Sequence, residues 1–159
     1  MKQIRVNIAD YAVSAGKITL ATIGLGSCVA IVLHDVRGGI GGLAHVLLPN
    51  EALSSRQDSP GKFAATAVPA MITRMQELGA KSDIAARLIG GASMFAALIP
   101  NSGPSLGSRN IAAARAACAA NGVAVVGEDV GGSHGRSVYF DVREGSVLVR
   151  SLAVGDVAL

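Results

Sequence analysis

Cys28 is the residue of this chain whose surroundings best suit covalent chemistry. It ends the segment TIGLGSC at residues 22–28, in which two glycines permit close backbone approach just before the thiol. A loop of this kind can present a nucleophile and leave backbone N–H groups free to stabilise an oxyanion. We therefore expect Cys28 to be a nucleophile that attacks a carbonyl carbon, with Gly26 and Ser27 beside the developing oxyanion.

His45 is the candidate base, because a histidine inside the apolar run 42–49 is costly unless its ring has partners. If residues 29–34 and 40–48 form an antiparallel hairpin with the loop 35–38, the numbers of opposed residues sum to 73. Cys28 then faces His45, with Cβ atoms about 4.5–5.5 Å apart. An imidazolium at that distance would lower the pKa of the thiol and later protonate the departing nitrogen.

Three further positions could complete such a site. The hydroxyl of Thr22, on the preceding predicted strand, can accept the other imidazole N–H. Gly90 and Gly91 end another predicted strand, where they either bring backbone amides to the site or simply make a tight turn. His134, in a glycine-rich loop, either lines the site or is an exposed loop residue.

Other residues of reactive type have plainer interpretations. A free cysteine is often a small buried hydrophobe, and Cys118, in an alanine-rich segment, is expected in a helix core. His34 adjoins a turn and is expected to be solvated. The two cysteines and three histidines show no metal-binding spacing, so we expect neither a metal nor an organic cofactor.

The elements that must position these residues are mostly strands. Strands outnumber helices, and hairpins outnumber βαβ units, so the predicted class is α+β. Strands are predicted at 4–8, 18–23, 29–34, 40–48, 85–89, 123–127, 137–142 and 146–151, and helices at 60–78 and 109–120, the second capped by Ser108.

The bulk composition fits one domain spanning residues 1–159. Half of the residues are hydrophobic, and the formal net charge is +3 without any Lys/Arg cluster, which does not suit a nucleic-acid partner. No apolar run reaches membrane-spanning length, and residues 1–6 lack the apolar core of a secretion signal. We expect a cytoplasmic protein, without membrane insertion, whose two thiols stay reduced.

Several segments together resemble the chemoreceptor glutamine deamidases, the CheD family. They occur in the order typical of that family and cover the chain from about residue 5 to about residue 150. The matching segments are TIGLGSC at 22–28, AHVLLP at 44–49, PGKF at 60–63, GGASMF at 90–95, GSRN at 107–110 and EDVGG at 128–132.

The resemblance implies a fold and an activity. It implies two packed mixed β-sheets flanked by helices in four layers, α/β/β/α, as in toxin deamidases. It implies a protein-glutamine glutaminase with a catalytic triad of Cys28, His45 and Thr22. Its substrates would be glutamines of methyl-accepting chemoreceptors, whose hydrolysis to glutamate tunes chemotactic adaptation. In some organisms a CheY-phosphate phosphatase, CheC, binds such enzymes.

Two other functions fit the same residues. The chain could be a binding module that grips chemoreceptors or a phosphatase without turnover. It could also be a related thiol hydrolase, such as a protease or a methylesterase acting on glutamate methyl esters. The segments 50–59 and 97–108 are expected to rim the substrate groove and to influence the choice among these substrates.

Overall fold

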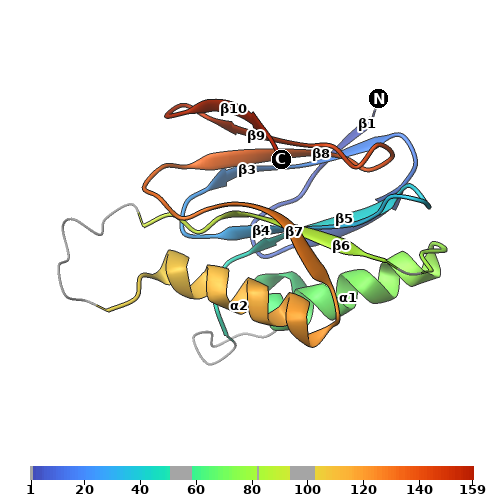
Figure 1. Cartoon of the computed structure of the whole chain (residues 1–159), viewed down its shortest axis with the longest axis horizontal. Helices are drawn as coiled ribbons and strands as arrows, with labels where there is room; N and C mark the ends of the chain where they lie inside the picture. Colours follow the sequence, from blue (N-terminus) through green and yellow to red (C-terminus); the bar gives the residue numbers. More distant parts are fainter. Residues whose placement is uncertain (1, 51–58, 82, 94–102) are drawn as a thin grey trace.

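The computed structural model describes residues 2–50, 59–81, 83–93 and 103–159, and these residues form two stacked β-sheets and a layer of helices (Figure 1). The first sheet has the strand order β1-β3-β8-β9-β10, and the second has the order β2-β5-β4-β6-β7. Each sheet is mixed, because β1 pairs with β3 and β6 pairs with β7 in parallel, whereas the other pairs are antiparallel.

The strand and helix bounds are as follows. The first sheet comprises β1 (Lys2–Arg5), β3 (Ile18–Leu25), β8 (Arg136–Asp141), β9 (Val147–Ser151) and β10 (Gly155–Ala158). The second comprises β2 (Tyr11–Ala15), β5 (Ile40–Val46), β4 (Val29–Asp35), β6 (Ala85–Gly90) and β7 (Ala124–Val130). The helices are α1 (Ala64–Glu77), which follows a short 3₁₀ turn (Pro60–Lys62), and α2 (Leu106–Ala120).

The α+β class and the two mixed sheets are confirmed, but the layer order differs from the four-layer expectation. Both described helices cover the outer face of the second sheet, and no described helix covers the first sheet (Figure 1). The layers of the described chain are therefore β/β/α. Strands β2 and β10 were not predicted, and α2 begins before Ser108 because Ser105 is its N-cap and accepts from the Ser108 N–H at 3.1 Å.

Strand β4 is buried on both faces and separates two hydrophobic layers. Val29, Ile31 and Leu33 pack in the layer between the second sheet and the helices. Ala30 and Val32 alternate with them and pack in the layer between the two sheets, together with Cys28 just before the strand. This second layer, which we call the inter-sheet layer, contains the candidate site.

The β4–β5 hairpin has the predicted loop length but a different register. Asp35 pairs with Ile40 and Ala30 pairs with His45, so the numbers of two residues that face each other sum to 75 rather than 73. The loop is Val36–Gly39 because Gly39 takes the left-handed conformation, with φ +62°, and the Asp35 carboxylate accepts from the Gly38 N–H at 3.2 Å. The predicted direct opposition of Cys28 and His45 is therefore wrong by two residues, which leaves both on the same face of the sheet.

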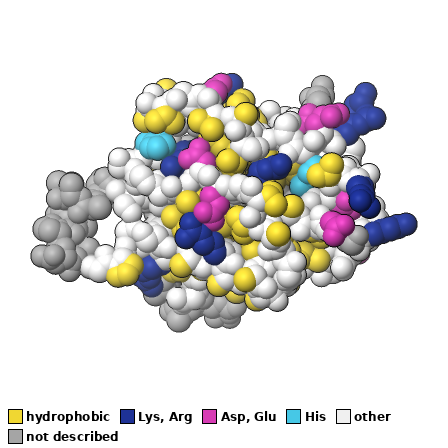
Figure 2. All heavy atoms as spheres, viewed as in Figure 1, with side chains coloured by type: hydrophobic (Ala, Val, Ile, Leu, Met, Phe, Trp, Pro, Cys, Tyr) yellow, Lys and Arg dark blue, Asp and Glu magenta, His cyan; other side chains and the backbone are white. Residues whose placement is uncertain are grey.

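The surface viewed in Figure 2 carries acidic and basic side chains interspersed with apolar ones, without one large patch of a single sign. Within the described ranges, no helix has the length and the apolar character needed to cross a membrane.

Candidate active site

Thr22, Cys28 and His45 all point into the inter-sheet layer. Leu43, two residues before His45 on β5, and Leu20, two residues before Thr22 on β3, belong to the apolar cluster of that layer. Thr22 and His45 are fully buried, and Cys28 is 8% exposed. The first sheet thus contributes Thr22, and the second contributes Cys28 and His45.

Thr22 and His45 form a hydrogen bond between the sheets. The Oγ1 atom of Thr22 lies 2.6 Å from Nδ1 of His45 and 2.8 Å from the carbonyl oxygen of Val6. The carbonyl can only accept, so the single hydroxyl proton of Thr22 goes to Val6. The hydroxyl oxygen must then accept from His45, which places the proton of the neutral imidazole on Nδ1 and leaves Nε2 as an acceptor.

The Nε2 atom of His45 is buried and has no hydrogen-bond partner among the described residues. Burial disfavours the charged ring and lowers the pKa of His45 to about 4. The resting imidazole is therefore neutral near pH 7, with an unprotonated nitrogen available to take a proton.

Burial also raises the pKa of the Cys28 thiol, an effect that the backbone N–H of Cys28 partly offsets. The sequence had suggested an imidazolium that lowers this pKa, and that expectation is wrong for the resting state. A neutral thiol and a neutral imidazole favour general-base chemistry, in which the thiol loses its proton as it attacks.

Two glycines hold the backbone of Cys28. The Gly91 N–H donates to the carbonyl oxygen of Cys28 at 2.8 Å, so this amide is already used in a backbone hydrogen bond. Gly90 has φ +108°, and a Cβ atom there would overlap the same carbonyl oxygen. The structure shows the tight turn at Gly90 and Gly91, and the Gly91 amide is used in it by the Cys28 carbonyl.

The loop before Cys28 carries backbone donors that remain unused. The Gly26 carbonyl accepts from Ala92 at 2.9 Å, which fixes the loop against the end of β6. Within the described ranges, the N–H groups of Ser27 and Cys28 donate to no carbonyl or side-chain oxygen. Ser27 and Gly26 are half-buried, so the loop borders the site at its surface end.

Asn110, on α2, joins this loop to the strand that carries His45. Its side-chain Nδ2 lies 2.9 Å from the carbonyl oxygen of Ser27 and 3.1 Å from that of Leu47, and the residue is fully buried. In the sequence, the GSRN segment at 107–110 stands out only through the family resemblance. The contacts of Asn110 with residues 83 and 63 positions away have no local signal in the sequence.

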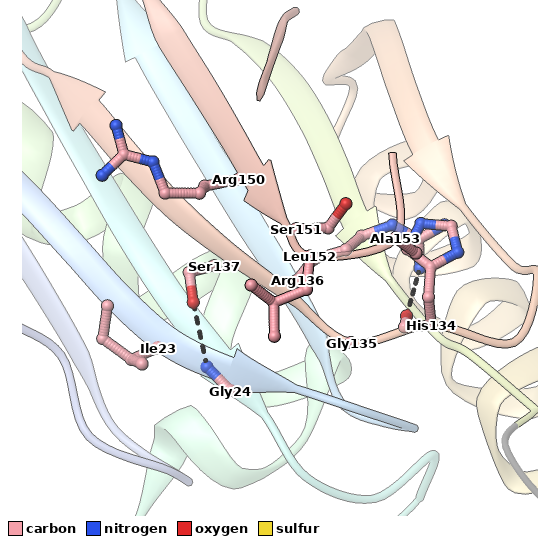
Figure 3. A pocket seen from close by; sticks show the side chains of 10 residues that line it. All are labelled: Ile23, Gly24, His134, Gly135, Arg136, Ser137, Arg150, Ser151, Leu152 and Ala153. Atoms are coloured by element: carbon pink, nitrogen blue, oxygen red, sulfur yellow. Dashed lines mark hydrogen bonds between the residues drawn. The ribbon is translucent and has the colours of Figure 1, made fainter. Parts of the chain in front are cut away.

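His134 lies outside this site and lines a separate cavity of about 450 Å³ on the outer face of the first sheet (Figure 3). The cavity borders Ile23 and Gly24 of β3, whereas Thr22 points to the other side of that strand. The Nε2 atom of His134 is buried and has no hydrogen-bond partner in the described part of the chain.

His34 and Cys118 are both core residues. His34 is 2% exposed, with Nε2 3.0 Å from the carbonyl oxygen of Val142 and its ring against Phe140, so its predicted solvation is wrong. Cys118 is fully buried in the helix layer, as predicted. Among the described residues, no three His, Cys, Asp or Glu side chains lie close enough to hold a metal ion. The segments expected to rim a groove lie mainly outside the described residues, at 51–58 and 94–102.

Comparison with known proteins places these features in a family. The family model described as CheD chemotactic sensory transduction matches residues 47–151. The chain belongs to the CheD family. A relative from Clostridium kluyveri named "Probable chemoreceptor glutamine deamidase CheD" is 41% identical over 98% of this chain and 96% of its own length. A relative with the same name from Desulforamulus reducens is 38% identical over 94% of this chain and 91% of its own length. Another from Clostridium botulinum is 36% identical over 98% of this chain and 96% of its own length.

These CheD relatives align with nearly the whole chain, whereas the family model begins after Cys28 and His45. The geometry around those residues therefore adds information that the family model alone does not carry. Deamidation of chemoreceptors is the activity that the names of the CheD relatives support.

Proposed function

We propose that this CheD family member hydrolyses glutamine side chains of methyl-accepting chemoreceptors to glutamate through Cys28, His45 and Thr22. The observation that carries the mechanism is the Thr22–His45 hydrogen bond, which fixes the tautomer and leaves Nε2 of His45 unpaired in the layer that also holds Cys28. One domain, residues 1–159, carries the activity in the cytoplasm.

The separation of the base and the nucleophile suits this role. In a regular ladder with this register, Cys28 would oppose Leu47 and lie diagonally across from His45. The Cα atoms of such a diagonal pair are typically about 7–8 Å apart. Long side chains bridge such diagonal pairs. The Thr22 bond holds one ring nitrogen of His45, so the opposite nitrogen is the one available to the thiol.

The first half of the reaction forms a thioester. The Cys28 sulfur attacks the side-chain amide carbon of the glutamine, and its proton passes to Nε2 of His45. The carbonyl π bond breaks, and the resulting oxyanion is stabilised by the loop at Gly26 and Ser27 and by the N–H of Cys28. The imidazolium then donates its proton to the leaving nitrogen, the C–N bond breaks, and ammonia departs.

The second half regenerates the enzyme. His45 accepts a proton from water as the oxygen attacks the thioester carbon, and the C–S bond breaks to give glutamate and the Cys28 thiol. Gly90 and Gly91 keep the Cys28 backbone in place through both halves. The mechanism uses no metal ion or organic cofactor.

A glutamine side chain fits the limited exposure of Cys28. Two methylenes, Cβ and Cγ, separate the amide carbon from the Cα atom of the glutamine. The amide can therefore reach the sulfur atom of a residue that is 8% exposed. An exposed receptor helix can present such a side chain, and its conversion to glutamate would change adaptation. A CheC-type phosphatase that covers the same opening would regulate the enzyme.

The test is incubation with the cytoplasmic domains of cognate receptors, followed by peptide mass spectrometry and an ammonia assay. Conversion of specific Gln residues to Glu, with release of ammonia, supports the proposal. Release of methanol from glutamate methyl esters would instead indicate a methylesterase, and cleaved peptides a protease. Binding without any product would indicate an adaptor.

A further inference from the structure

The β4–β5 ladder stops just where the nucleophile stands. The last pair is Val29 with Val46, and continued pairing would set Cys28 opposite Leu47. Instead, both backbone groups of Leu47 have other partners. Its N–H donates to the carbonyl oxygen of Lys62 at 3.0 Å, and its carbonyl accepts from the side chain of Asn110. On the other side of β4, the carbonyl oxygen of Cys28 accepts from the Gly91 N–H at 2.8 Å, whereas the N–H of Cys28 donates to no oxygen of the described residues.

Asn110 also fixes the direction of that N–H. Its amide donates to the carbonyl oxygen of Ser27, which belongs to the same peptide unit as the N–H of Cys28. No peptide bond of the described chain is cis, and in a planar trans peptide the C=O and N–H point in opposite directions. The Ser27 carbonyl points to α2, so the Cys28 N–H points away from the helix layer.

That direction leads toward the inter-sheet layer, which holds the Cys28 side chain. The N–H is close enough to its own sulfur to favour the thiolate. A donor placed beside the attacking sulfur lies near the oxygen that becomes negative when the sulfur adds to a carbonyl. A hydrogen bond to the carbonyl end of the same peptide further polarises its N–H.

The orientation of the Asn110 amide is determined by its partners. Both partners are carbonyl oxygens, which can only accept, so the nitrogen must face them. The Oδ1 atom is left buried without a partner among the described residues, which costs stability. Gly107 and Gly91 allow α2 to approach this closely, since a Cβ on either would overlap the opposite segment.

We propose that Asn110 is a positioning residue of the oxyanion hole: by holding the carbonyl of Ser27 against that of Leu47, it fixes the Ser27–Cys28 peptide and keeps the N–H of Cys28 aimed at the reacting oxygen. This inference rests on the proposed role of Cys28 as nucleophile. Asn110 itself touches no substrate, and its effect passes through the Ser27–Cys28 peptide.

Two small probes separate this role from a general structural one. The compound 4-nitrophenyl acetate acylates a thiol through a tetrahedral oxyanion: the sulfur–carbon bond forms, 4-nitrophenolate leaves, and the thiol proton goes to His45. Iodoacetamide alkylates the same sulfur by direct displacement of iodide, with no oxyanion. The ratio of the two rates at Cys28 therefore reports on oxyanion stabilisation, and the Cys28→Ala variant supplies the background.

The variants are Asn110→Leu, which keeps most of the volume and removes both donors, and Asn110→Ala, which serves if the first does not fold. The matched control is Asn121→Ala on the same helix, where Nδ2 donates to the Ala117 carbonyl at 2.8 Å and has no link to Cys28. We expect acylation to fall about 10–100-fold in the Asn110 variants while alkylation changes far less. The control should retain both rates.

An unchanged ratio in a folded variant, whether both rates fall equally or neither falls, overturns the proposal. The probes do not depend on the receptor substrate. If the wild-type protein fails to deamidate receptors but the ratio falls in the variants, the proposed function fails and this inference stands. If receptors are deamidated and the ratio is unchanged, the inference alone fails.

Discussion

The Oγ1 atom of Thr22 lies 2.6 Å from Nδ1 of His45, in a hydrogen bond that joins the two β-sheets. One partner comes from β3 and the other from β5, and both are fully buried. Because the hydroxyl donates onward to the Val6 carbonyl, the contact determines which imidazole nitrogen carries the proton. A side chain of the first sheet thus sets the protonation pattern of a histidine in the second.

Replacement of Thr22 by valine should test this orienting role. Thr22→Val keeps the shape but removes the acceptor of the His45 N–H, so we expect the kcat for receptor deamidation to fall about 10–100-fold with KM little changed. Thr22→Ser keeps a hydroxyl and should retain most activity. Thr66→Val, a control on α1 where the hydroxyl bonds only local carbonyls, should leave kcat unchanged. A Thr22→Val enzyme with wild-type kcat would contradict the role.

The two cysteines provide a matched pair. Cys28→Ala should abolish deamidation of receptor peptides, measured by mass spectrometry, while circular dichroism shows a folded protein. Cys118→Ala removes a fully buried sulfur from the helix layer, so it should lower the free energy of unfolding by about 1–2 kcal/mol and keep the activity. Full activity of Cys28→Ala would rule out the proposed nucleophile.

Thiol labelling should reveal the resting protonation state. Burial raises the pKa of Cys28, so its alkylation by iodoacetamide should keep rising with pH up to 9 and above. Cys118, whose pKa burial raises to about 11, is fully buried and should label more slowly at every pH. Peptide mass spectrometry assigns the label. A Cys28 rate that levels off near neutral pH would indicate a preformed thiolate–imidazolium pair instead.

The neutral, buried His45 should make stability depend on pH. Its pKa is about 4 in the folded protein and about 6.5 in an unfolded chain, so the unfolded state binds more protons between these values. The free energy of unfolding should therefore fall as pH drops from about 6.5 to about 4, by up to about 3 kcal/mol from this residue. Urea unfolding of His45→Gln should show a shallower decline, and an identical pH profile would contradict the assignment.

Gly90 should be far less tolerant of a side chain than a glycine whose Cβ position faces open space. Gly90→Ala combines a positive φ with overlap of the Cys28 carbonyl, so we expect a loss of about 2–4 kcal/mol and a strong decrease in activity. Gly122→Ala is the control, with φ +69° and open space around its Cβ position, and should cost about 1 kcal/mol without affecting kcat. Thermal unfolding and a deamidation assay measure both, and equal effects in the two variants would exclude a role for the close contact at Gly90.

Much of this architecture could be predicted from local sequence patterns. The runs around Val29 and Ile40 predict adjacent strands, and strand alternation puts Cys28 and His45 on one face even with the register two residues away. The short strands β2 and β10 have little apolar alternation because they are edge strands, β2 half-buried and β10 mostly exposed, so the sequence pattern does not reveal them.

Other features depend on contacts that no local pattern encodes. The burial of His34 and the contact of Asn110 with the loop before Cys28 arise from packing between segments far apart in the chain. The lowered pKa of His45 and the raised pKa of Cys28 follow from the depth of the inter-sheet layer, which composition does not reveal. The placement of both helices on one sheet likewise follows from tertiary packing.

The division of Thr22, Cys28 and His45 between two sheets has a consequence during biosynthesis. A nascent chain that has formed only the second sheet would hold its thiol and imidazole on one surface, but the ring would lack the Thr22 contact that orients it. Full hydrolytic competence would then appear only when the two halves dock. An incompletely assembled molecule would be a much weaker catalyst toward the amides of neighbouring proteins, so structural maturation itself would limit stray deamidation.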